Sequence, residues 1–195
     1  MDFNQLSYND HTLFHMLRHF EYVNEQARIC LNDRGYSMES IDENLAMPGS
    51  KFHSSFATDI KSLVAQLKIG KQIQIQERKK YQEIVLSFEK FNLADGIGSV
   101  GICFRNELDT LYAKQPVLKF NRGVQLWHSL VSKLPNTYEM TVVLKKQKNS
   151  YFLITAFPGL PALPIPHKKM NLVELELSKE FWKDKVFLEK VKSKK

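Results

Sequence analysis

Apolar residues recur with a helical period in the first part of this chain and gather into strand-like runs in its later part. Over residues 10–33 they recur every three or four positions, which predicts one amphipathic helix. Asp10 is the expected N-cap of this helix, and Gly35 is its expected stop. The apolar face of the helix consists of Leu13, Leu17, Phe20, Ala27 and Leu31.

A second helix is predicted to begin after Ser54 or Ser55 and to end at Gly70. Its apolar positions also fit the helical period. The polar stretch 36–51 between the two helices is typical of an exposed loop. The apolar positions of the second helix are Phe56, Ile60, Leu63, Val64 and Leu67.

The strongest strand pattern lies near the C-terminal end of the chain. Two runs rich in β-branched and aromatic residues, Thr137–Lys146 and Tyr151–Phe157, flank the polar residues 147–150 and predict a β-hairpin. Both runs contain three consecutive apolar residues, so we expect strands covered on both faces at the centre of a sheet. Helices first and strands later predict an α+β fold, with N-terminal helices packed against a small antiparallel sheet.

Other elements are predicted from shorter patterns. The glycines from Gly96 to Gly101 lack the spacing and the following Lys-Ser/Thr of a phosphate-binding loop, so we expect a turn there. The prolines at 158, 161, 164 and 166 predict an extended exit from the hairpin. The remaining expectations are a short helix over 72–82, strands at Ile84–Phe88 and Val100–Arg105, a helix over Arg122–Lys133 with Leu126, Trp127 and Leu130 as its core face, and a basic helix over 178–192.

Composition adds a basic charge balance to this picture. The 195 residues have a net charge of +7 and a pI near 9.3, which favours a polyanionic partner, either nucleic acid or an acidic protein. The tail Lys168–Lys195 holds nine lysines and five acidic residues, so it supplies +4 of that charge. Cys30 and Cys103 are expected to be reduced thiols. With neither a secretory signal nor an apolar run of membrane-spanning length, a soluble, cytoplasmic protein is expected.

Three histidines share one helical stripe. His11, His15 and His19 are four residues apart, which makes them neighbours on a helix. They are candidates for a metal site, for ordinary boundary residues, or for a catalytic base that takes a proton from a ribose 2′-hydroxyl. Catalysis also needs a cation near the phosphate, and Arg18, Arg28 and Arg34 lie on or just after the same predicted helix.

The order of several motifs carries a resemblance. HTLFHMLRH at 11–19 is followed by HSSFATDIKSLVAQL at 53–67, GIGSVGIC at 96–103 and VVLKKQKNSYFLITAFPG at 142–159. In this order they resemble the ribonuclease A-like C-terminal toxin domain of contact-dependent growth inhibition proteins and related bacterial polymorphic toxins. The resemblance runs from about His11 to Pro158, with an insertion near 106–136, and it makes residues 1–160 the toxin domain. Residues 161–195 are then a basic C-terminal extension.

The resemblance also implies residue roles. His19 matches the family's catalytic histidine, and Thr155 matches the threonine of its Thr-Ala-Tyr-Pro motif. The family's helix arginine corresponds to Arg28, with Arg34 as the alternative. Phe157 replaces the family's tyrosine, a departure that puts full activity in doubt unless Tyr151 or Tyr22 supplies the hydroxyl. Supporting roles fall to His15, Arg34, Tyr151 and Lys145.

The function implied is that of a bacterial toxin that cleaves cellular RNA, such as tRNA, inside the cytoplasm of a target bacterium. Family members attack the phosphodiester with the ribose 2′-hydroxyl, and they use neither a metal nor a cofactor. Their fold is ribonuclease A-like with two lobes, and an immunity protein holds them inactive. From the basic charge we expect an acidic immunity protein over the cleft between His19 and Thr155. The alternative is an inactive homologue that acts as an RNA- or protein-binding module.

Overall fold

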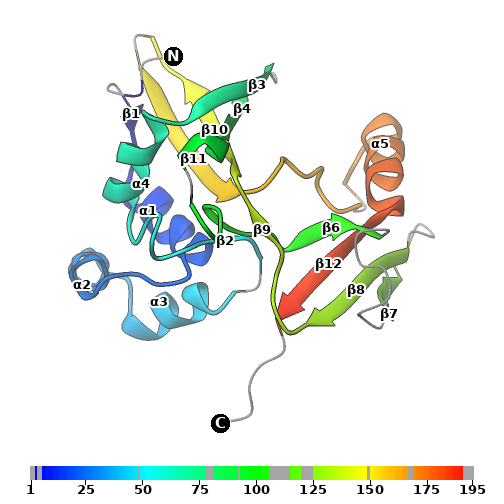
Figure 1. Ribbon diagram of the computed structural model, residues 1–195, viewed down its shortest axis with the longest axis horizontal. Helices are drawn as coiled ribbons and strands as arrows, with labels where there is room; N and C mark the ends of the chain where they lie inside the picture. Colours follow the sequence, from blue (N-terminus) through cyan, green and yellow to red (C-terminus); the bar gives the residue numbers. More distant parts are fainter. Residues whose placement is uncertain are drawn as a thin grey trace. The chain divides into compact units, whose positions relative to one another are not determined.

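The computed structural model describes residue 3 and residues 6–47, 49–77, 81–91, 93–105, 115–119, 125–148, 150–166 and 169–190 (Figure 1). It has an α+β fold, as the sequence predicted. The chain divides into two compact units, and each is built from two separate segments. The first unit comprises Met1–Ser99 and Asn136–Pro161, and the second comprises Val100–Pro135 and Ala162–Lys195. In the described part of the chain, no helix is long and apolar enough to span a membrane.

The first unit contains four α-helices and a five-stranded sheet among its described elements. In the order β1-β11-β10-β4-β3, β1 and β11 are parallel and the other neighbours are antiparallel. The elements are β1 (Leu6–Ser7), α1 (Asp10–Met16), the 3₁₀ helix η2 (Leu17–His19), α2 (Glu25–Asp33), α3 (Met38–Leu45), β2 (Lys51–Phe52), α4 (Ile60–Leu67), β3 (Lys71–Glu77), β4 (Gln82–Ser87), the 3₁₀ helix η3 (Glu89–Phe91), β5 (Gly98–Ser99), β9 (Asn136–Thr137), β10 (Glu139–Lys146) and β11 (Tyr151–Pro158).

The prediction of one continuous helix over 10–33 was wrong, because the chain leaves the helix after His19. Phe20 is extended, forms a parallel bridge with Phe52 and is buried in the core. Asn24 then starts α2 by accepting a hydrogen bond from the backbone N–H of Ala27. Asn9, rather than Asp10, caps α1 by accepting from the N–H of Thr12. The apolar residues still recur at a helical period, because the helices on either side of the break pack against the same core.

The stretch 36–51 is not simply a loop, since it contains α3. Ser37 caps this helix by accepting from the N–H of Ser40, and Ile41 is fully buried. The second predicted helix is confirmed as α4, but its cap is Asp59 rather than Ser54 or Ser55. The Asp59 carboxylate accepts from the N–H of Ser62, and the hydroxyl of Ser62 accepts from the N–H of Asp59.

The predicted hairpin is confirmed as β10 and β11, which run side by side in the middle of the sheet (Figure 1). Met140, Val142 and Leu144 are fully buried, and so are Leu153 and Ala156. The strand predicted at Ile84–Phe88 is β4, shifted by one or two residues. The short helix predicted over 72–82 was wrong, because residues 71–77 form the edge strand β3.

A second, three-stranded sheet of the first unit, β2-β5-β9, explains the glycines. At Gly96 φ is +71°, and an added Cβ would lie 2.3 Å from the carbonyl oxygen of Thr137. At Gly98 it would lie 2.5 Å from the carbonyl oxygen of Lys51. The glycines are therefore required where backbones approach closely, as expected for a turn rather than a phosphate-binding loop.

The second unit has a four-stranded sheet in the order β6-β12-β8-β7 and one helix, α5. The helix predicted over Arg122–Lys133 was wrong in its described part, which is strand β8; Leu130, an expected core residue, is 55% exposed. The basic helix predicted over 178–192 ends at Lys183, where β12 begins after one residue. The elements are β6 (Ile102–Phe104), β7 (Gln115–Lys119), β8 (Gln125–Val131), α5 (Leu172–Lys183) and β12 (Lys185–Lys190).

Candidate active site

Helix α1 is fastened along strand β11, and this positions the histidines. The Thr12 hydroxyl donates to the carbonyl oxygen of Leu153 at 3.2 Å. The sulfur of Met16 accepts from the backbone N–H of Ala156 at 3.2 Å and from the Thr155 hydroxyl at 3.6 Å. Because α1 follows β11 in this way, η2 and its His19 lie over the C-terminal end of that strand.

His19 packs between two other rings. Its ring centroid lies 5.7 Å from that of His15, in an edge-on arrangement, and 5.7 Å from that of Phe157. Its Nδ1 is 3.3 Å from the carbonyl oxygen of Ser50. A carbonyl oxygen only accepts hydrogen bonds, so Nδ1 carries the hydrogen and Nε2 holds the lone pair in the neutral ring. Nε2 is therefore the basic atom of this histidine.

Burial lowers the pKa of His19 to about 3. The hydrogen bond to Ser50 acts in the opposite direction, and the nearby charge of Arg18 adds to the lowering, with smaller contributions from His15 and Lys51. Burial also lowers the pKa of His15, again with a contribution from Arg18. His19 is consequently a neutral imidazole at physiological pH, and it is a weaker base than a solvated histidine.

Two cations lie near His19. Lys51 donates from Nζ to the carbonyl oxygens of Arg18 at 3.0 Å and Leu45 at 2.7 Å. Burial lowers the pKa of Lys51, Arg18 lowers it further, and Glu21 raises it. Arg18 and Lys51 therefore place two positive charges near the histidine. The sequence analysis named Arg18 as a candidate and did not name Lys51.

A further histidine was also missed. His53 follows β2, and its Nδ1 lies 3.3 Å from a Glu21 carboxylate oxygen, while its Nε2 lies 3.2 Å from Oδ1 of Asn136. Its side chain is 18% exposed. The three residues are separated by 32 and 83 positions in the sequence, so no local pattern could have joined them.

Thr155 and Phe157 share one face of β11, because successive strand residues alternate in direction. His19 contacts Phe157, and Thr155 lies two residues before Phe157 on this face of the strand. The Thr155 hydroxyl contacts the thioether of Met16, which is a weak acceptor. This contact leaves the hydroxyl energetically available for a stronger partner.

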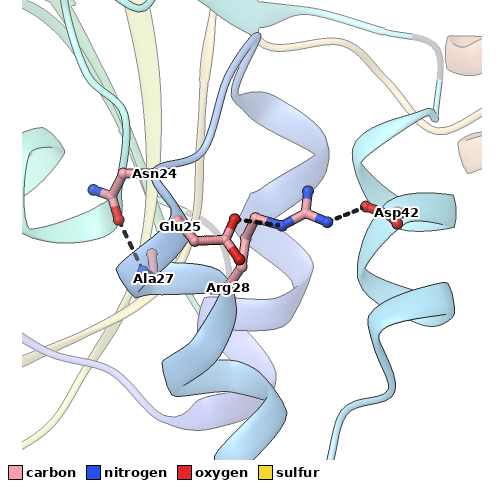
Figure 2. A network of polar contacts seen from close by, with 5 residues as sticks. All are labelled: Asn24, Glu25, Ala27, Arg28 and Asp42. Carbon is pink, nitrogen blue, oxygen red and sulfur yellow. Dashed lines mark hydrogen bonds and ion pairs between the residues drawn. The ribbon is translucent and has the colours of Figure 1, made fainter.

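Arg28 and Arg34 are engaged elsewhere. Figure 2 shows Arg28 on α2 between Asp42 of α3, at 2.6 Å, and Glu25, at 3.6 Å. Arg34 pairs with Asp10 at the start of α1. Neither pairing includes His19 or Thr155. Both arginines connect the helices of this unit to one another.

The remaining supporting residues lie at the other end of the hairpin. Tyr151 begins β11 and pairs with Lys146, six residues before Phe157, which corresponds to about 20 Å along a strand. Lys145 is exposed on β10 opposite Phe152. The Tyr151 hydroxyl therefore does not replace the one that Phe157 lacks. Tyr22, the other candidate, is 56% exposed just after η2.

The stripe of His11, His15 and His19 is divided between α1 and η2, and His11 is exposed. Over the described residues, no three histidine, cysteine or acidic side chains gather closely enough to hold a metal ion. No protein-family model matches the chain, and comparisons with curated proteins and with solved structures also found no match.

Proposed function

We propose that the first unit is an endoribonuclease that cleaves cellular RNA by attack of the ribose 2′-hydroxyl on the adjacent phosphate. The observation that carries the proposal is the Nε2 lone pair of His19 beside the strand that bears Thr155, with Arg18 and Lys51 close by. In this reading the unit has a ribonuclease A-like fold, and the protein is a bacterial toxin with tRNA among its candidate substrates.

Each group then has a defined task. Nε2 of His19 accepts the 2′-hydroxyl proton while O2′ attacks phosphorus; the bond from phosphorus to the 5′-oxygen breaks, this oxygen takes up a proton from water, and a 2′,3′-cyclic phosphate remains. The Thr155 hydroxyl donates to a phosphate oxygen, where negative charge increases in the transition state. Arg18 and Lys51 attract the phosphate, and this role for Arg18 replaces the one expected of Arg28 or Arg34.

For His19 to act as a base, its low pKa must rise when the substrate binds. A base with a pKa of about 3 has little affinity for a proton. A bound phosphodiester brings a negative charge next to the ring, and an opposite charge at that distance raises the pKa of an imidazole. We therefore expect the substrate itself to activate His19.

A non-catalytic RNA- or protein-binding module is the second candidate. Two observations favour it: the lowered pKa of His19, and the ring of Phe157 where the toxin family has a hydroxyl. The net charge of +7 would favour RNA binding under either interpretation.

Cleavage of labelled RNA by the purified protein in excess chelator tests the proposal, with the cyclic phosphate identified by mass spectrometry. We expect His19→Ala to lower the rate by about 10²-fold or more, as for loss of an acid–base group. His11→Ala is the matched control, because His11 is an exposed histidine on the adjoining helix α1. RNA that binds but remains intact with the wild-type protein would favour the binding module.

As a toxin, the protein would need an inhibitor in the cell that makes it. We expect an acidic immunity protein at the His19–Thr155 region, since opposite charge accelerates encounter with a basic surface. Co-expression with the candidate partner should rescue growth, and His19→Ala should make the partner unnecessary.

A further inference from the structure

The outermost strand of the five-stranded sheet, β3, is exposed along its whole length. All seven residues from Lys71 to Glu77 are exposed, including Ile73 at 48% and Ile75 at 45%. Within the described residues, β4 is the one strand that pairs with β3. The opposite edge of β3 thus offers backbone N–H and C=O groups to another chain, a state that native edge strands usually avoid.

We propose that β3 pairs with β3 of a second copy of this chain, in an antiparallel arrangement with a two-fold axis at Gln74. The strand sequence KQIQIQE reads the same in both directions except that Lys and Glu exchange at its ends. Antiparallel pairing about Gln74 therefore places Ile73 opposite Ile75 of the second copy. It also places Gln72 opposite Gln76, and Lys71 opposite Glu77, with each contact occurring twice.

Charge selects this arrangement over the parallel one. Opposite charges facing each other across two strands stabilise the pair, and like charges destabilise it. A parallel, in-register pair would place Lys71 opposite Lys71 and Glu77 opposite Glu77. The strand carries one charge of each sign, so at this edge it avoids the repulsion expected between two chains of net charge +7.

The isoleucines add an apolar contact to the backbone pairing. Ile73 and Ile75 are exposed in a single copy. The pairing covers both, because Ile73 of each copy lies opposite Ile75 of the other. The two five-stranded sheets would then form one continuous sheet across the axis. The inference concerns this edge alone and is independent of the proposed ribonuclease.

A bulge in β3 limits the strength of the contact between the two copies. The pairing with β4 shifts between Gln72 and Gln74, so Ile73 has no partner on β4 and the strand carries a bulge there. A bulge increases local twist and limits how far an edge extends. A contact of one twisted strand per copy is small, so we expect a concentration-dependent dimer rather than a permanent one.

Cysteine cross-linking tests the register directly. In the proposed pair, the Cα atoms of the two Gln74 residues are about 4.5–5.5 Å apart, which permits a disulfide. Gln74→Cys should therefore give a disulfide-linked dimer under mild oxidation. Gln76→Cys is the matched control, because Gln76 has the same exposure but lies about 13 Å from its own copy along the strands. Equal cross-linking of both variants, or of neither, would overturn the proposal.

Charge exchange gives a second, independent measurement. By sedimentation velocity across a concentration series, Lys71→Glu and Glu77→Lys should each weaken the dimer about tenfold, since each creates two like-charge pairs. The double variant restores opposite charges and should return the dimer to wild-type strength. A wild-type protein that stays monomeric at the highest concentration, or a dimer indifferent to these changes, would rule out this interface.

Discussion

His19 and Phe157 face each other between η2 and β11, with their ring centroids 5.7 Å apart and their planes tilted by 35°. An apolar ring at this place removes water from the imidazole and contributes to the burial that lowers its pKa. Phenylalanine also has no hydroxyl at this position. The same residue therefore lowers the basicity of His19 and supplies no hydrogen-bond donor beside it.

Phe157→Tyr should consequently increase RNA cleavage. The added hydroxyl would lie near His19 and could donate to the phosphate as charge develops, so we expect a gain of about tenfold in rate. Single-turnover cleavage measures it. Phe152→Tyr, on the same strand but toward its other end, is the control and should leave the rate unchanged.

Thr155 offers a separate test of the site. Thr155→Val keeps the shape of the side chain and removes its hydroxyl, whose partner among the described residues is the sulfur of Met16. We expect a fall in cleavage of about 10- to 100-fold with little change in unfolding by urea. Thr155→Ser should retain most of the activity. Equal rates for the Val and Ser variants would remove Thr155 from the mechanism.

The lowered pKa of His19 predicts how stability depends on pH. In the unfolded chain this histidine binds a proton near its ordinary pKa of 6.5, whereas in the folded protein it does so near 3. The contribution to stability is therefore complete above about pH 6.5 and is lost as pH falls toward 3, because the unfolded state binds the proton first. Within this window the free energy of unfolding should fall by up to about 1.4 kcal/mol per pH unit.

His19→Asn isolates that contribution. Asparagine keeps an N–H donor for the Ser50 carbonyl but does not titrate, so the variant should lose stability less steeply between pH 6.5 and 4. Urea unfolding of both proteins at several pH values gives the comparison. His11→Asn, at an exposed position, should follow the wild-type profile, and parallel profiles for all three proteins would contradict a neutral, partly buried His19.

The cap of α4 gives a prediction about stability alone. Asp59 is partly desolvated, which by itself raises its pKa, but hydrogen bonds from Ser62 and Asn24 outweigh this and leave the pKa lowered. Asp59→Ala removes the cap and should cost about 0.5–2 kcal/mol of stability. Asp59→Asn retains an acceptor for the N–H of Ser62 and should cost less. Urea unfolding at pH 7 distinguishes the two, and equal losses would mean that the hydrogen bond accepted from Ser62 is not what Asp59 contributes.

The sequence predicted those parts of the fold in which pattern and environment agree. The hairpin of β10 and β11 was found because both strands are rich in β-branched and aromatic residues and supply residues to the core, and α4 was found because its apolar period is unbroken. The helix expected over 10–33 failed at Phe20, where a tertiary bridge to Phe52 outweighs a helical period. Strand β3 was predicted as a short helix, although Gln and Ile alternate in it. All seven of its residues are exposed, so neither face of the strand is buried in a core.

In the candidate site, too, residues in local motifs were predicted and residues brought in by tertiary contacts were not. Arg18, His19 and Thr155 belong to short motifs and were named as candidates from them. Lys51 and His53 reach the region only because β2 lies beside Phe20, a pairing between segments about thirty residues apart. Arg28 was chosen as the arginine nearest to the implied position, but its ion pair with Asp42 depends on α3, a helix within the stretch predicted to be a loop.

The central position of β12 in the second sheet has a consequence for the order of events during synthesis. Its neighbours are β6 and β8, and β12 pairs with β8 in parallel although some fifty residues separate them. The first unit needs nothing beyond residue 161, so a ribosome releases its whole sequence while the second unit still lacks this strand. During that interval β6 and β8 lack the strand that lies between them and pairs with both. A stalled or shortened product would then contain a complete first unit and an unfinished second one.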